Sequence, residues 1–165
     1  MQTLFLQNAR LVDPEAGVET EGAVLVQNGR IAEVGAPNAV PPDAQRIDCG
    51  GNVLAPGIVD IGVKVSEPGE RHKESFRTAG SAAAAGGVTT IVTRPDTLPA
   101  IDTPETLEFV TRRANETAPV HVFPMAALPK ERAGREVVEI GFLKDAGAVA
   151  FTDWYHVVQG NQVLS

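Results

Sequence analysis

The sequence has 165 residues, of which 43% are hydrophobic and 21% charged, and its formal net charge is −7. This composition is that of a globular chain and excludes a largely disordered one, and no apolar run approaches the ~20 residues that a membrane span needs. The acidic balance without a lysine and arginine cluster argues against nucleic-acid binding, and the N-terminus lacks the pattern of a signal peptide, so we expect a cytoplasmic protein that binds neither nucleic acid nor membrane.

Residues 1–54 carry short β-type patterns. The runs LFLQNARLV, AVLVQNGRIAEVG and RIDCGGNVLAPG predict three or four antiparallel strands that form one small sheet. Asn28 and Gly29 give the two-residue signal of a tight hairpin turn. Cys49 is the only cysteine, so it can form no disulfide within the chain and we expect it to be a small buried residue. Prolines predict an exposed loop between the strands, at Pro37, Pro41 and Pro42.

From Pro56 onwards, strand and helix patterns alternate. The first strand pattern reads as buried, and the alanine-rich helix after it ends at Gly86 and Gly87. The next helix has Thr103 as its N-cap and Pro104 as its first residue. Four strand-helix alternations imply parallel strands with right-handed crossovers. The predicted strands cover 58–65, 88–94, 119–128 and 148–153, and the predicted helices cover 74–87, 103–116 and about 133–145.

The final residues, GNQVLS, have the pattern of the start of another helix. A complete barrel of parallel strands needs eight such units and ~250 residues, so about half is present. Four parallel strands alone leave a barrel edge and an apolar face uncovered. We therefore expect a fragment, or a second half that another chain or a symmetry-related copy supplies.

Four segments carry a family pattern in order and spacing: NVLAPGIVD, EPGERHKESFRTAGSAAAAGGVTTIV, RPDTLPAIDTPE and LKDAGAVAFTD. They resemble the dihydroorotases of the amidohydrolase superfamily, in the branch that also contains allantoinases and dihydropyrimidinases. The resemblance implies an α/β fold in which residues 55–165 form the N-terminal part of a (β/α)8 TIM-like barrel, with about four β/α units, preceded by a small β-sandwich segment at residues 1–54. It also implies a zinc site at the carboxyl ends of the strands, where the metal activates a water that attacks a ring amide.

The first strand of the family carries His-x-His-x-Arg, and here the matching residues are Gly62, Lys64 and Ser66. Two histidines two residues apart on a strand point the same way and can share one metal. Glycine has no ligand atom, and a protonated lysine repels a divalent cation. Ser66 stands where the family's arginine holds the substrate carboxylate by a two-pronged bond. The resemblance therefore implies that the metal ligands at Gly62 and Lys64 and the substrate anchor at Ser66 have been lost.

The second and fourth strands depart from the family pattern as well. Asp96 stands where the family has an asparagine next to an anionic substrate, a like-charge arrangement that disfavours binding, and Arg94 could offset that charge or redirect it. Asp153 matches an aspartate that bridges the metals, while Trp154 and Tyr155 replace the aspartate and glycine that follow in the family. Asp153 is thus the one candidate catalytic residue and remaining metal ligand, and a catalytic zinc needs about three protein ligands. Asp153 and Asp96 could also form an acid-base pair on neighbouring strands.

The three histidines do not form a ligand set. His72 lies in a segment where the family also has a histidine, and we expect it to be a capping residue or to support the site from outside it. His121 and His156 have no spaced partner, so we expect each to be structural or exposed.

These departures predict a dihydroorotase-like protein of pyrimidine biosynthesis that has kept its scaffold and lost its catalysis. In this family, catalytically silent homologues are structural partners of aspartate carbamoyltransferase, so the resemblance implies that partner, a homo-oligomer, and no cofactor. The alternative is an active metal-dependent cyclic amidohydrolase of dihydroorotase, dihydropyrimidinase or allantoinase type, with an atypical zinc site that includes Asp153. A third possibility is an interaction module, because an open half-barrel exposes an adhesive edge.

Overall fold

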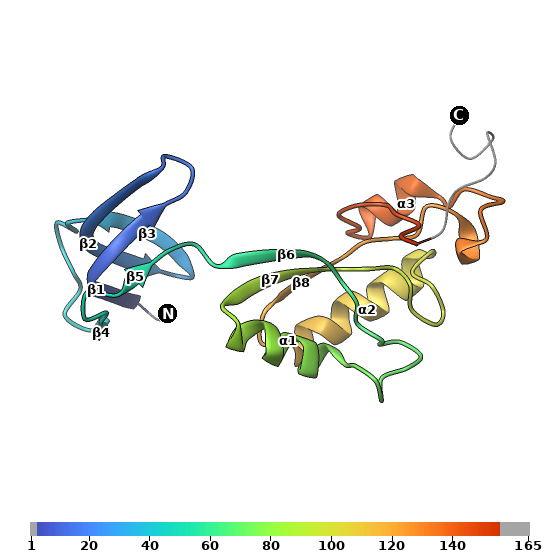
Figure 1. The fold of residues 1–165 in the computed structure, drawn as a ribbon, viewed down its shortest axis with the longest axis horizontal. Helices are drawn as coiled ribbons and strands as arrows, with labels where there is room; N and C mark the ends of the chain where they lie inside the picture. Colours follow the sequence, from blue (N-terminus) through green and yellow to red (C-terminus); the bar gives the residue numbers. More distant parts are fainter. Residues whose placement is uncertain (1–2, 156–165) are drawn as a thin grey trace. The chain divides into compact units, whose positions relative to one another are not determined.

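A computed structural model describes residues 3–155 of the chain. The chain divides into two compact units, Met1–Pro56 and Gly57–Ser165. Within the described residues no helix is long and apolar enough to cross a membrane. Figure 1 shows the β-rich first unit in blue and the second unit, which alternates strands and helices, from green to red.

The first unit is a five-stranded sheet with the order β3-β2-β1-β4, in which β5 also pairs with β1. The hairpin between β2 and β3 is confirmed, because Asn28 and Gly29 both have positive φ, 54° and 73°, as a type I′ turn requires. The strands are β1 (Thr3–Asp13), β2 (Val18–Gln27), β3 (Arg30–Gly35), β4 (Gln45–Asp48) and β5 (Val53–Leu54).

Two expectations for this unit were wrong. Strands β4 and β5 pair parallel with β1, so the sheet is mixed rather than antiparallel. The loop of residues 36–44 causes this, because it is long enough to return the chain to the start of β1 before β4 begins. Cys49 is only partly buried, at the edge of a small cluster formed by Ala9, Leu11 and Val24.

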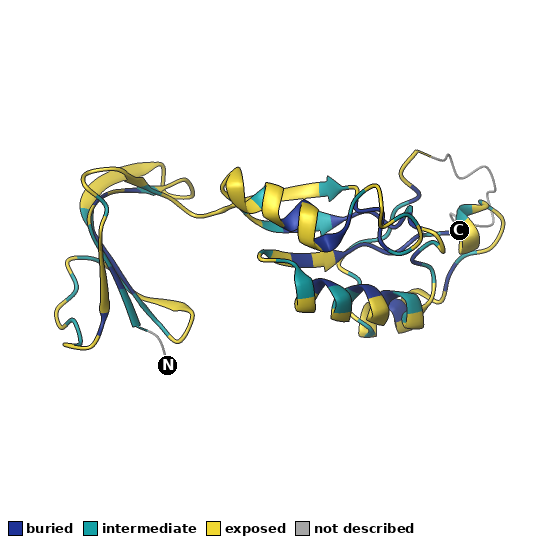
Figure 2. Ribbon diagram, turned by 90° about the horizontal axis from the view of Figure 1, so that it is seen from below, coloured by how far each residue is buried: buried dark blue, intermediate teal, exposed yellow. Residues whose placement is uncertain are grey.

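The second unit is built on a parallel sheet with the order β6-β7-β8. Helix α1 packs on β7 and helix α2 on β8, and Figure 2 shows both helices with buried residues on one side and exposed residues on the other. The elements are β6 (Ile58–Val63), α1 (Phe76–Ala85), β7 (Val88–Thr93), α2 (Pro104–Thr117), β8 (His121–Pro124), the 3-10 helix η1 (Lys130–Arg132) and α3 (Ile140–Asp145).

The ends of the two long helices follow from local sequence. Ser75 caps α1 in a capping box with Thr78, and the helix ends at Gly86, whose N–H donates to carbonyls of the last turn. Thr103 caps α2 ahead of Pro104, as predicted. These signals fix where each helix begins relative to the strand before it.

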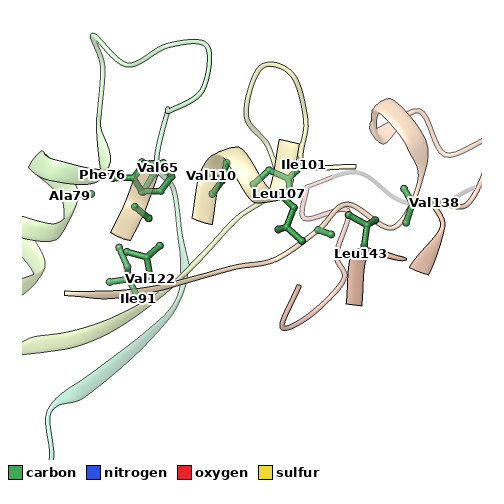
Figure 3. Packing of buried hydrophobic residues seen from close by; sticks show 12 residues of the cluster. Val65, Phe76, Ala79, Ile91, Ile101, Leu107, Val110, Val122, Val138 and Leu143 are labelled. Carbon is green, nitrogen blue, oxygen red and sulfur yellow. The ribbon is translucent and has the colours of Figure 1, made fainter. Parts of the chain in front are cut away.

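A single apolar core joins the helices of this unit to its sheet (Figure 3). Phe76 of α1, Ile91 of β7 and Leu107 and Val110 of α2 are at most 1% exposed. Val138 and Leu143 extend the core to the segment after β8. This core holds the carboxyl ends of the strands, where the candidate site lies, in fixed relative positions.

Strand β6 differs from the predicted buried strand. Ile58, Val59 and Ile61 are 56%, 56% and 69% exposed. The strand lies at the edge of the sheet, and the two long helices pack on β7 and β8 instead. Apolar residues on both faces are typical of a strand that is buried on both sides. In the described part of the chain, however, these side chains of β6 stay exposed.

The last predicted helix and strand are shorter in the structure. Only Ile140–Asp145 is helical in the predicted range 133–145, because Gly134 has φ +68° and Val137 forms a β-bridge with Pro129. The predicted strand 148–153 makes one parallel bridge, between Phe151 and Ala126. It still lies alongside the residues that follow β8 and exchanges three backbone hydrogen bonds with residues 124 and 126.

Candidate functional site

The residues singled out from the sequence gather at the carboxyl ends of the parallel strands. Gly62 and Lys64 lie in and just after β6, Arg94 and Asp96 follow β7, and Asp153 follows the bridge at Phe151. In parallel α/β sheets this end of the strands is where ligands bind. The structure therefore brings the residues singled out from the sequence to the same end of the parallel sheet.

Asp96 is the centre of an ion-pair cluster. Its Oδ2 lies 2.7 Å from Lys64 Nζ and 2.5 Å from Arg94 Nη2, and its Oδ1 accepts from Arg94 Nε at 3.0 Å. Arg94 thus forms a bidentate ion pair with the Asp96 carboxylate, which is stronger than a pair with one hydrogen bond. The side chains of Asp96 and Arg94 are 7% and 8% exposed, whereas Lys64 is 45% exposed. The three residues form one buried network with an exposed amine at its rim.

Two effects oppose each other at the Asp96 carboxyl. Burial raises its pKa, because a charge is poorly solvated there, but the hydrogen bonds and charges of Lys64 and Arg94 lower it more. The resulting pKa lies below the ordinary value of 3.8. Asp96 is therefore an anion at neutral pH, and its carboxylate forms ion pairs with both Lys64 and Arg94.

Aromatic rings cover this cluster and reach the end of β6. Arg94 Cζ lies 4.5 Å from the ring centroid of Trp154 and 4.7 Å from that of Tyr155. Gly62 has φ +94°, and a Cβ at that position would lie 3.1 Å from Cζ3 of the Trp154 indole and closer still to Cη2. The indole therefore takes the space that a side chain at position 62 would need. A hydrogen bond with Trp154 and the charge of Arg94 lower the pKa of the Tyr155 phenol.

Asp153 is buried, 7% exposed, and neither of its carboxylate oxygens has a hydrogen-bond partner among the described residues. Its charged neighbour is Arg132, whose Nε lies 3.7 Å from Oδ1 and whose Nη2 donates to the Asp153 carbonyl at 3.3 Å. Asp153 and Asp96 thus each have a basic partner of their own. The proposed acid-base pairing of these two residues stays a prediction.

The remaining predicted positions have ordinary surroundings. Ser66 is buried, and its carbonyl accepts from the Glu70 N–H at 2.8 Å. His72 is exposed in the turn before α1, and His121 is exposed at the start of β8. His156 lies outside the described residues.

The donor groups at the strand ends do not fit a zinc ion. Residues 3–155 contain no group of three or more histidine, cysteine or acidic side chains placed to hold a metal. Gly62 offers no ligand atom, and the carboxylate of Asp96 is bound by two cations. A third cation, Arg132, lies beside Asp153. Positive side chains thus stand beside both carboxylates, where a metal ligand would have to be free.

Sequence reasoning missed Arg132 and the position of the Trp154 indole. Arg132 belongs to no motif, and it lies 21 residues before its partner in the chain. The only available signal was indirect, since a buried aspartate at a strand end without histidine partners requires some other positive charge.

Comparisons with known proteins agree with this architecture. The sequence model of the dihydro-orotase-like family matches residues 51–165. A dihydroorotase of Syntrophus aciditrophicus is 39% identical over 151 residues, which are 91% of this chain and 35% of that protein. A dihydroorotase of Aquifex aeolicus is 36% identical over 164 residues, 99% of this chain and 39% of that protein.

Among solved structures, the L-hydantoinase (dihydropyrimidinase) of Arthrobacter aurescens aligns with a TM-score of 0.77 and 28% identity, over 92% of this chain and 32% of that one. The chain therefore spans about a third of the length of the relatives it matches. The predicted fold class is confirmed: an α/β chain with the N-terminal part of a (β/α)8 barrel after a small β segment.

Proposed function

The chain belongs to the dihydroorotase-like family of the amidohydrolase superfamily, and from this premise we propose that it is a noncatalytic member. In this proposal the first-strand zinc ligands and the substrate arginine have been replaced by Gly62, Lys64 and Ser66. The observation that carries the proposal is the ion-pair cluster at the strand ends. Asp96 is fully engaged by Lys64 and Arg94, and the Trp154 indole lies on Gly62.

This cluster supports loss of activity for two physical reasons. Zinc-activated water needs an open coordination position beside about three protein ligands, and the cationic side chains beside both aspartates oppose a metal ion electrostatically. An anionic ring substrate needs a free cation, and the guanidinium of Arg94 is taken by Asp96 and covered by two aromatic rings. The exposed Lys64 amine alone gives no orientation to a ring.

A metal measurement tests the loss of the zinc site. We expect the purified chain, saturated with zinc and then freed of excess by gel filtration, to retain far less than one zinc per chain by mass spectrometry. Retention of one equivalent in the parent chain, abolished in Asp153→Ala but kept in the matched variant Asp145→Ala at the end of α3, would refute the proposal.

The biological role we propose is that of a structural partner of aspartate carbamoyltransferase in the cytoplasm, within a homo-oligomeric assembly of pyrimidine biosynthesis. It is supported by the resemblance to the dihydroorotase family. We expect the chain and the transferase of the same organism to co-elute in gel filtration, and the transferase to melt at a higher temperature in the complex. Separate elution at micromolar concentrations, with no change in melting, contradicts this role.

A second function is favoured by one observation, the buried carboxylate of Asp153 without a hydrogen-bond partner. Such a group is a natural ligand for a cation, so an active cyclic amidohydrolase with an atypical site is the competing proposal. Stoichiometric zinc together with hydrolysis of a dihydropyrimidine or hydantoin ring, both lost in Asp153→Ala, would establish it.

A further inference from the structure

Three consecutive side chains at the strand ends each contact an arginine from another part of the unit. Asp153 pairs with Arg132, which lies in η1, and Trp154 and Tyr155 both lie against Arg94, which follows β7. The segment 153–155 is thus contacted from two directions. No single motif contains these contacts, because they join residues 21 to 61 positions apart.

The contact between Asp153 and Arg132 is one of charge. The carboxylate is 5% exposed and its two oxygens lack hydrogen-bond partners among residues 3–155, so it depends on a nearby positive charge to stay ionised inside the fold. Arg132 supplies that charge, with a side chain only 16% exposed. The backbone of η1 is shaped to present it: Glu131 and Arg132 both have positive φ, and the Glu131 N–H donates to Asp102 Oδ2 at 2.7 Å.

The contact with Arg94 is one of stacking. Asp96 accepts hydrogen bonds from two nitrogens of the guanidinium, and this two-point contact fixes the orientation of its plane. Trp154 and Tyr155 then lie with their centroids within 5 Å of the same carbon and meet edge to face, 5.8 Å apart at 78°. Cation–π contacts are stronger at partly desolvated sites, which favours the contact with Trp154, 38% exposed, over that with Tyr155, 78% exposed.

The segment 153–155 packs against β6 at Gly62, which has no side chain. The indole of Trp154 lies so close that a Cβ there would overlap it. Trp154 itself has φ +56°, an uncommon value for a bulky residue, which the contacts on either side must hold in place. The ring can rest on β6 only because position 62 has no side chain.

We propose that Arg94 and Arg132 form an arginine clamp, which holds residues 153–155 as a plug over the end of β6, with the Asp153 side chain buried and the two rings at the surface. Together with the Lys64 ammonium, the two guanidinium groups place positive charge at this end of the fold, where the family resemblance implies the metal of an active relative. This inference rests on the proposed noncatalytic function. If the clamp is present, neither the two carboxylates nor the strand ends are free to bind zinc.

Trp154 is the only tryptophan in the sequence, so its fluorescence reports the plug directly. We expect Arg132→Gln to shift the emission of the folded chain to the red and to raise the acrylamide quenching constant roughly twofold, as the 38% exposed ring becomes free. Arg132→Lys, which keeps the charge, should stay near the parent values. Arg71→Gln, which removes an exposed arginine from the same unit, is the matched control and should change nothing.

Circular dichroism shows whether each variant is folded, and Asp153→Asn replaces Arg132→Gln if that variant is not. Removal of the Asp153 charge should release the ring in the same way. Emission and quenching that match the parent in a folded Arg132→Gln or Asp153→Asn chain overturn the proposal, even if stability falls. A saturable shift of the parent emission on addition of zinc chloride overturns it as well. Binding to the transferase enters neither outcome, so the clamp and the proposed partner can fail separately.

Discussion

Removal of the Glu67 carboxylate should strongly destabilise the second unit. The Glu67 side chain is 5% exposed, and it joins the two long helices. Its Oε2 accepts the Phe76 N–H at 3.1 Å, at the start of α1, and its Oε1 accepts Arg113 Nε at 2.8 Å, on α2. Negative charge at a helix N-terminus is favourable, so the carboxylate stabilises α1 as well as its pairing with α2.

The magnitude follows from these partners. Loss of a buried partner from an ion pair costs about 3–5 kcal/mol when the remaining charge stays buried. Arg113 is 26% exposed, so water can solvate the guanidinium that is left behind, and the cost should be lower. We therefore expect Glu67→Ala to lower the free energy of unfolding by about 2–4 kcal/mol. Glu67→Gln keeps the shape and one acceptor but loses the charge, so about 1–2 kcal/mol is expected.

Urea unfolding followed by circular dichroism and by the single tryptophan measures both variants, with the slope on denaturant as a check of two-state behaviour. The matched control is Arg71→Gln, because Arg71 is 64% exposed and lies 3.6 Å from the same carboxylate. An exposed partner at that distance should contribute little. A Glu67→Ala chain within about 0.5 kcal/mol of the parent would refute the view that this carboxylate holds the helices together.

Three further changes test other parts of the fold. Leu107→Ala removes a fully buried side chain from the core of the second unit and should cost about 2–5 kcal/mol in urea unfolding. Gly62→Ala should displace the Trp154 ring and shift its emission to the red, because the added Cβ overlaps the indole and φ is +94°; unchanged emission contradicts the observed seat of the ring. The pKa of Asp96 is lowered in the fold, so its stabilisation is present above the ordinary pKa of 3.8 and is lost as the pH falls below it. Acid titration of stability should therefore be flatter in Asp96→Asn than in the parent below that pH.

The sequence predicted the elements that have strong local signals. It was wrong where contacts with distant strands determine the direction or the length of an element. Helix α2 begins at Pro104 after Thr103, as expected, because the cap and the proline act on their own neighbours. The direction of β4 was wrong because strand direction depends on which distant strand accepts it. The predicted helix at 133–145 was too long because helical pattern alone does not register the bridge between Pro129 and Val137.

The sequence predicted that the candidate residues lie at the strand ends, but it did not predict the contacts between them. The motif order located Gly62, Lys64, Asp96 and Asp153 at the strand ends, since parallel strands bring their carboxyl ends to one edge. The pairing of Arg94 with Asp96, which the sequence left open, is now observed. The partner of Asp153 could not be predicted, because a turn of irregular backbone supplies it.

Four of the positions that, by the resemblance, depart from the dihydroorotase pattern contact one another in pairs in the structure. Lys64 departs on the first strand and Asp96 on the second, and they form an ion pair of 2.7 Å. Gly62 departs on the first strand and Trp154 after the fourth, and the indole lies on the glycine. A histidine at position 62 would collide with this indole, and an asparagine at position 96 would leave Lys64 without its carboxylate. These paired contacts support the proposal that the strand end has lost its metal site, because each of the two pairs stabilises the fold in its present form.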